Sequence, residues 1–203
     1  MNDPTTFLTL ALAVTLTEQA QTLDQRIDKY VTQKSIDTFL VYSFPCSGGI
    51  PFDSCQYDEP HYLIWRKNGI FFLKRFDYCQ TYKILALDTF NPLTFYLNNK
   101  KTIDKEQIRQ PTYYEVKKNK NTFDTLLTTS TVDHSCYHKF HLPLTKKPKY
   151  KYADTYDLDF KIFDNGKENI YYSYNQKTKL KALIDLTTTL VQKLDLDKRL
   201  EGD

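Results

Sequence analysis

Three of the four histidines in the chain fall within eight residues of one another, around a cysteine: His134, Cys136, His138 and His141. Every second residue of a β-strand faces the same way, about 6–7 Å apart, so His134, Cys136 and His138 would line up on an extended segment. Imidazole nitrogens and thiolates are the ligands that zinc prefers, in tetrahedral sets of four. The pattern predicts a zinc site at His134, Cys136 and His138, completed by His61 or a carboxylate.

The same cluster has two competing interpretations. Cys136 can be half of a disulfide, for example with Cys79, and the histidines then line a solvated face. Cys136 or Cys79 could instead be a nucleophile beside a histidine base, but neither follows the exposed turn or precedes the helix that such chemistry favours. The chain has no C-x-x-C, H-E-x-x-H, G-x-S-x-G, Walker or Rossmann motif, and only five glycines. We therefore expect no cofactor in the preferred interpretation.

The number and spacing of the cysteines suggest disulfide bonds. All four cysteines, Cys46, Cys55, Cys79 and Cys136, are candidates, because four is an even number. Cys46 and Cys55 bracket a loop that contains two glycines and a proline, which a disulfide between them could clamp. Disulfides persist mainly in exported proteins, so these residues favour export.

The first twenty residues bear on the same question. The apolar stretch 7–16 has the length of a signal-peptide core, but no Lys or Arg precedes Arg26 to form a basic region. An apolar 3–4 spacing also continues as far as Tyr30, which is typical of a helix over 4–34 capped by Asp3. Residues 1–20 are thus either a signal peptide or the start of a helix. The location stays open between export, to the periplasm or beyond, and the cytoplasm.

The element that must organise the fold is residues 62–76, where two runs of aromatic and aliphatic residues flank Asn68-Gly69. Such a pair between apolar runs is the strongest short-range signal for a β-hairpin. A two-residue loop pairs Lys67 with Ile70 and continues outward from there. Both faces of this hairpin are apolar, which predicts a central position in the sheet with both faces covered.

The remaining elements complete a single α+β domain over residues 1–203. We expect strands over 38–44, 81–87, 93–97, 112–116 and 123–131, a second Asn-Gly hairpin over 156–174, and a final helix capped by Asn175. That helix carries an apolar stripe formed by Leu180, Leu183, Ile184, Thr187, Leu190, Val191 and Leu194. These elements predict an antiparallel sheet of about five to seven strands, with the N- and C-terminal helices packed on one face.

Charge and hydropathy exclude several classes of partner. The net charge is +3, from 28 basic and 25 acidic residues, which predicts no nucleic-acid ligand although basic and aromatic residues alternate over 146–152. No apolar run has the length of a membrane span.

Two functions remain. We expect a non-enzymatic, soluble binding domain that recognises a protein partner, of the inhibitor or immunity type. The absence of catalytic motifs supports it, as do sixteen tyrosines and Trp65, since these residue types are common at the centres of interfaces. The alternative is a metal-binding protein or metal-dependent enzyme that uses His134, Cys136 and His138.

Overall fold

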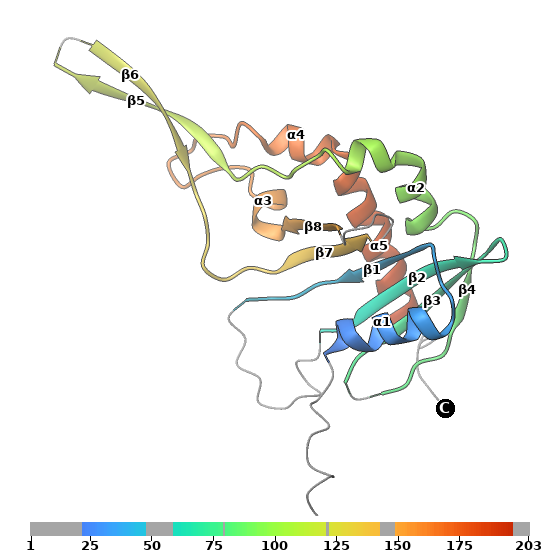
Figure 1. The fold of residues 1–203 in the computed structure, drawn as a ribbon. Helices are drawn as coiled ribbons and strands as arrows, with labels where there is room; N and C mark the ends of the chain where they lie inside the picture. Colours follow the sequence, from blue (N-terminus) through green and yellow to red (C-terminus); the bar gives the residue numbers. More distant parts are fainter. Residues whose placement is uncertain (1–21, 48–58, 79, 121, 143–148, 197–203) are drawn as a thin grey trace, which may run out of the picture.

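The computed structural model describes residues 22–47, 59–78, 80–120, 122–142 and 149–196 of the 203-residue chain. Figure 1 shows its elements in order along the chain: α1 (Leu23–Gln33), β1 (Phe39–Ser43), β2 (His61–Lys67), β3 (Ile70–Phe76), β4 (Leu85–Leu87), α2 (Pro92–Ile103), β5 (Thr112–Asn119), β6 (Thr122–Thr129), β7 (Tyr137–Leu142), β8 (Lys149–Asp154), α3 (Thr155–Asp159), α4 (Tyr172–Lys177) and α5 (Lys179–Leu196).

Six of the strands form one antiparallel sheet in the order β4-β3-β2-β1-β7-β8. The α+β class and the expected number of strands are confirmed. Among the described strands, β5 and β6 pair only with each other, as a separate two-stranded ribbon that projects from the body of the molecule (Figure 1). None of the helices in the described ranges is long and apolar enough to cross a membrane.

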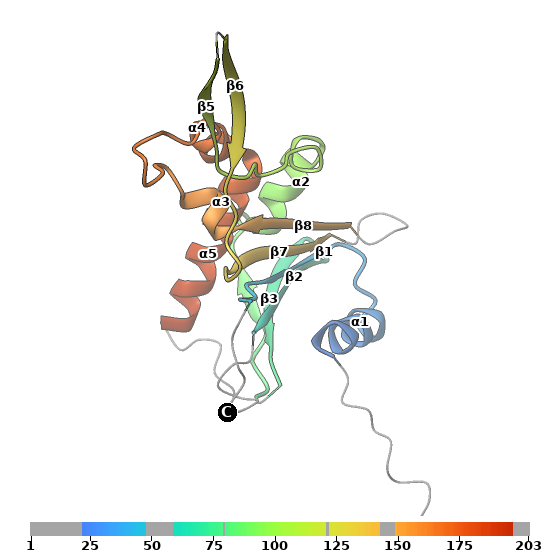
Figure 2. The same ribbon diagram turned by 90° about the vertical axis from the view of Figure 1, so that its left-hand side faces the viewer.

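The N- and C-terminal helices lie on opposite faces of the sheet, and the expectation that they share one face was wrong (Figure 2). Leu23, Ile27 and Val31 of α1 pack on Leu63 and Trp65 on one side. Helices α2 and α5 pack on the other side. The physical reason is the hairpin itself, because two apolar faces require two covering layers.

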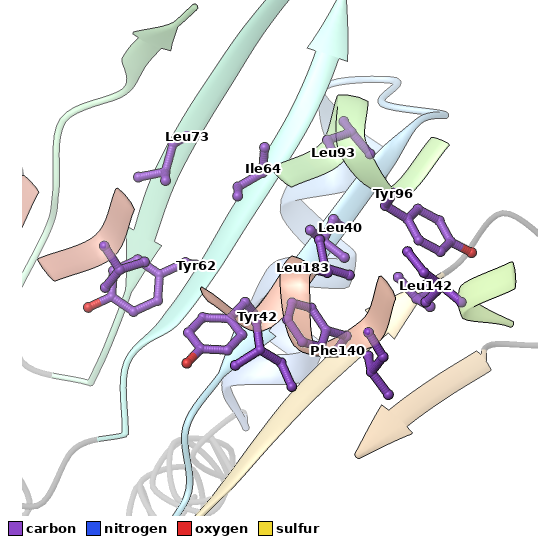
Figure 3. Packing of buried hydrophobic residues seen from close by; sticks show 14 of the residues in the cluster. Leu40, Tyr42, Tyr62, Ile64, Leu73, Leu93, Tyr96, Phe140, Leu142 and Leu183 are labelled. Carbon is purple, nitrogen blue, oxygen red and sulfur yellow. The ribbon is translucent and has the colours of Figure 1, made fainter. Parts of the chain in front are cut away.

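The larger core lies between the sheet and helices α2 and α5. Strand residues Leu40, Ile64 and Leu73 meet Leu183 of α5 and Tyr96 of α2, and all five are inaccessible to solvent (Figure 3). The stripe expected on the last helix is part of this core, apart from the partly buried Leu190 at its margin and Thr187, whose hydroxyl donates to the Leu183 carbonyl at 2.7 Å.

The β2–β3 hairpin has the predicted register, from Lys67 paired with Ile70 to Leu63 paired with Lys74, and it continues for two further pairs to His61 opposite Phe76. Asn68 and Gly69 both adopt positive φ, +52° and +79°, as a type I′ turn requires. Strands β1 and β4 flank it, so its predicted central position is also confirmed.

Helix α2 occupies a segment that was expected to be extended over 93–97. Asn91 precedes it in an extended conformation, and its Oδ1 accepts hydrogen bonds from the amides of Leu93 and Thr94 at 3.0 and 3.1 Å. Pro92 then takes the first helical position, where its missing N–H costs nothing. The Asn-Pro pair is therefore a helix start here, and the apolar residues after it pack at helical spacing into the core.

The second predicted hairpin, over 156–174, does not form. Helices α3 and α4 occupy its two ends, and a single bridge between Ile162 and Glu168 remains around Gly166. Asp154 caps α3 by accepting from the amide of Tyr156 at 2.8 Å. Phe160, which the predicted hairpin would place opposite Tyr171, instead belongs to an aromatic cluster with Tyr156, Phe163 and Tyr113.

Two helix starts also differ from expectation. Helix α1 begins at Leu23, because Thr22 is extended and forms a capping box with Gln25, so no helix runs continuously over 4–34. The cap expected at Asp3 and the question of a signal peptide at residues 1–20 lie outside the described residues. Asn175 does not cap the last helix.

Asn175 instead lies buried within α4, and its side chain bonds to the backbone N–H and C=O of Arg109. Helix α5 begins at Lys179, four residues after Asn175. Thr178 accepts from the amide of Lys181, and the Glu106 carboxylate accepts from the amides of Lys179 and Leu180. Tertiary contacts therefore set the start of α5.

Candidate functional site

The predicted zinc ligands do not come together. Cys136 is bonded through its sulfur to Cys46, so it has no thiolate to offer a metal. His134 lies in a bend before β7, whereas His138 is buried within that strand. Among the described residues, no group of three or more side chains of the ligand types His, Cys, Asp and Glu is placed to hold a metal ion.

The disulfide joins residues 90 positions apart, one shortly after β1 and the other directly before β7. This pairing makes the expected bonds of Cys46 with Cys55 and of Cys136 with Cys79 wrong. Cys55 and Cys79 themselves lie outside the described residues. The β1–β7 pairing that brings Cys46 to Cys136 is a long-range contact, and no spacing in the sequence signals it.

His138 has a different role from the expected one. Its Nδ1 lies 2.9 Å from the hydroxyl of Tyr42, and its ring stacks on that of Tyr42 and lies 4.7 Å, centroid to centroid, from Phe44. Burial lowers the pKa of His138 to about 4, although the nearby Asp185 carboxylate acts in the opposite direction. The imidazole is therefore neutral at physiological pH.

The third histidine of the cluster faces away from His138. His141 stacks on Tyr150 of β8 at 4.7 Å and meets Phe39 edge-on, on the side of the sheet where α1 lies. Burial lowers its pKa as well. The strand alternation that was invoked for a metal site thus places His138 and His141 on opposite faces of β7.

His138 separates two hollows between α5 and the sheet. The first, of about 280 Å³, is walled mainly by apolar side chains: Tyr42, Phe44, Pro60, Tyr62 and Val191. The second, of about 310 Å³, is more polar and is lined by Asp159, Lys181 and Asp185. His138 and Thr188 line both hollows, so the two are neighbours along α5, and we call the pair the crevice, with an apolar end and a polar end.

A group of exposed apolar side chains lies elsewhere, on the β5–β6 ribbon. Cross-strand pairing puts Tyr114 opposite Leu127 and Lys118 opposite Phe123, on the same face as Val116. We call Tyr114, Val116, Phe123 and Leu127 the ribbon face; their side chains are 55%, 60%, 71% and 59% exposed.

The reverse side of the ribbon is more polar. Glu115, Lys117 and Asp124 lie on it, together with Leu126, which is 43% exposed. The residue pattern predicts these strands but not their separation from the sheet. The available signal was the alternation of apolar and charged residues over 114–118, inside a lysine-rich segment.

The base of the ribbon is fixed to the body. The ring of Tyr113 packs on Phe163 at 4.5 Å, and the amide of Thr112 donates to Asn169 Oδ1 at 3.1 Å. The amide of Ile170 donates in turn to the carbonyl of Thr112 at 2.9 Å. The loop that replaced the second hairpin therefore holds the ribbon in its projecting position.

Neither the sequence nor the fold relates this chain to a known group. No model of a protein family matches it, and no curated protein or solved structure is significantly similar to it.

Proposed function

We propose that this chain is a non-enzymatic binding domain that recognises a protein partner through the β5–β6 ribbon. The observation that carries the proposal is the ribbon face, where four large apolar side chains are each more than half exposed on a projecting element. A two-stranded ribbon is marginally stable in water, and contiguous exposed apolar side chains usually mark an interaction site.

The charges around the ribbon face indicate the chemistry of the partner. The tip of the ribbon has more basic than acidic side chains: it carries Lys117, Lys118 and Lys120 but only one carboxylate among its described residues, that of Asp124. Lys117 also lies 3.9 Å from Glu115, nearer the body. A complementary partner surface is an apolar strip that contacts the ribbon face. It carries carboxylates at the end where the lysine-rich tip of the ribbon binds.

The size of the ribbon supports an inserted rather than a flat contact. Its strands contribute sixteen residues on two faces, eight from each strand, whereas a stable interface uses about 20–30 residues a side. A partner groove that receives the ribbon face and the strand edges, with the reverse side and Leu126 left toward solvent, contacts more of this short element than a flat surface does. Insertion of a projecting ribbon into a cleft is consistent with an inhibitor-type partner relationship.

The Cys46–Cys136 disulfide supports export to the periplasm or the exterior as the setting for this binding, because such bonds are rare in reducing compartments. Fractionation of the cells that make the protein, with the thiols alkylated at lysis, tests this. Export predicts that Cys46 and Cys136 are oxidised in a fraction outside the cytoplasm. A reduced pair in the cytoplasm would contradict it.

A photo-crosslinking amino acid at a single ribbon position tests the proposed function. We expect one major adduct in those cells when the probe replaces Phe123 or Leu127, and much less when it replaces Leu126 on the reverse side. The captured protein is then purified and titrated against the free chain. Leu127→Thr should weaken binding by at least about 10-fold, because central apolar residues of interfaces contribute more than 1–2 kcal/mol each.

Leu126→Thr is the matched control, since it makes the same substitution one residue away on the other face. We expect it to weaken binding less than Leu127→Thr does. If carboxylates of the partner bind the tip of the ribbon, Lys118→Glu should weaken binding more at low salt than at high salt. A partner that binds the Leu127→Thr variant as tightly as the unchanged chain would overturn the proposal.

A further inference from the structure

The crevice between α5 and the sheet is a second site, independent of the ribbon. We propose that it binds a small molecule with an apolar ring at one end, an oxygen acceptor in the middle and a cationic amine at the other end. Aromatic amino alcohols have this composition.

The apolar end of the crevice fits a flat ring. Aromatic side chains from β1, from β2 and from the segment after β1 surround it: Tyr42, Tyr62 and Phe44. Val191 of α5 closes the opposite wall. A ring placed here meets aromatic edges and faces, which pair favourably with another ring.

The middle of the crevice is lined by two side chains that can donate a hydrogen bond, His138 and Thr188. The phenol of Tyr42 is buried and needs an acceptor for its proton, and Nδ1 of His138 lies 2.9 Å away. With Nδ1 accepting, the single proton of the neutral imidazole is on Nε2. His138 is 8% exposed, and its Nε2 has no hydrogen-bond partner among the described residues. An oxygen of the ligand would satisfy this donor.

The polar end has an uncompensated negative charge. Lys181 Nζ lies 2.6 and 2.9 Å from the two carboxylate oxygens of Asp185, so these two charges balance each other. Asp159 also lines this end, and within the described ranges its carboxylate has no cationic partner. The net charge of these three side chains is −1, which favours a cation.

The size of the crevice limits the ligand to one ring and a short chain. Each hollow, about 280 and about 310 Å³, is at the lower limit of about 300 Å³ for small-molecule sites. The ring would fill one hollow and the amine would enter the other. The oxygen between them would lie next to His138, which borders both.

Titration with 2-amino-1-phenylethanol, followed by protein NMR, tests this assignment. We expect millimolar affinity, with shifted signals from Phe44, His138, Thr188 and Val191. 2-Phenylethylamine lacks the hydroxyl and should bind about 3- to 10-fold more weakly, as expected for one lost hydrogen bond. 1-Phenylethanol lacks the amine and ethanolamine lacks the ring, so each should also bind more weakly.

Two variants separate this site from general weak binding. His138→Phe keeps a ring but removes the donor, and the probe should then lose its preference for the hydroxyl. Asp159→Asn changes an exposed side chain, so the variant should fold normally, and it should bind the amine about 2- to 5-fold more weakly. The proposal is wrong if Asp159→Asn has no effect, if ethanolamine binds as well as the full probe, or if the shifted signals map outside the crevice.

Discussion

The β2–β3 hairpin and the β5–β6 ribbon are built alike and end in different environments. Each consists of two antiparallel strands of seven or eight residues joined by a tight turn that includes positive φ. In the first, Leu63, Ile64 and Leu73 are inaccessible to solvent. In the second, Leu126 and Leu127 are both exposed.

The difference comes from neighbours rather than from the strands. Strands β1 and β4 flank the hairpin, and helices cover both of its faces. The ribbon has no flanking strand in the described chain and is fixed only at its base. Alternating apolar residues therefore form a core in one place and leave an open surface in the other. This contrast is what makes the ribbon a candidate for partner binding.

The largest expected effect compares one leucine from each element. Leu63→Ala should lower the free energy of unfolding by about 2–5 kcal/mol, because it leaves a cavity in a packed core. Leu127→Ala should change it by less than about 0.5 kcal/mol, because that side chain is largely in water. Urea unfolding of both variants measures this. A large loss for Leu127→Ala would mean that the ribbon belongs to the cooperative core.

A smaller effect compares the two turns. Gly69→Val should cost about 1–2 kcal/mol, since a β-branched residue must then adopt a φ near +79°. Lys120→Gly should act in the opposite direction by less than about 1 kcal/mol, because Lys120 itself has a φ of +44° and glycine relieves that strain. Both are measured by denaturant unfolding. A folded Gly69→Val variant that lost only partner binding would contradict the structural role of this turn.

A third comparison is a pH dependence of stability that belongs to the sheet and not to the ribbon. The pKa of His138 is lowered to about 4 by burial, so between pH 6.5 and 4 the unfolded chain takes up a proton that the folded chain does not. His138 should therefore lower the stability as the pH falls through this range, and His138→Phe should remove this contribution from the slope. Leu127→Thr, in the ribbon, should leave the slope of stability against pH unchanged. An unchanged slope in His138→Phe would show that other groups dominate.

Sequence patterns predicted the elements that depend on turn residues and on the spacing of apolar residues. They failed where contacts between distant residues determine the structure. The register of β2–β3, the strands β5 and β6, and the stripe on α5 are all confirmed. The Asn165-Gly166 pair predicted a second hairpin from the same rule that worked at Asn68-Gly69. This second hairpin does not form, because Phe160 and Phe163 pack with Tyr156 and Tyr113 instead.

The candidate sites show the same division. Apolar alternation in 114–118 is visible in the sequence, but its exposure is not, because exposure depends on the absence of a covering layer. The crevice depends on Tyr42, His138 and α5, which are brought together from three distant parts of the chain. The disulfide likewise follows from β1 pairing with β7.

By itself, then, the sequence determined the α+β class and the central hairpin, because an Asn-Gly turn between two apolar runs needs no distant partner to set its register. It also determined that both faces of that hairpin must be covered. Only the tertiary structure decided which helix covers which face, which cysteines bond, and which alternating ribbon stays exposed. Those outcomes depend on contacts between residues far apart in the chain, and local propensity carries no information about them.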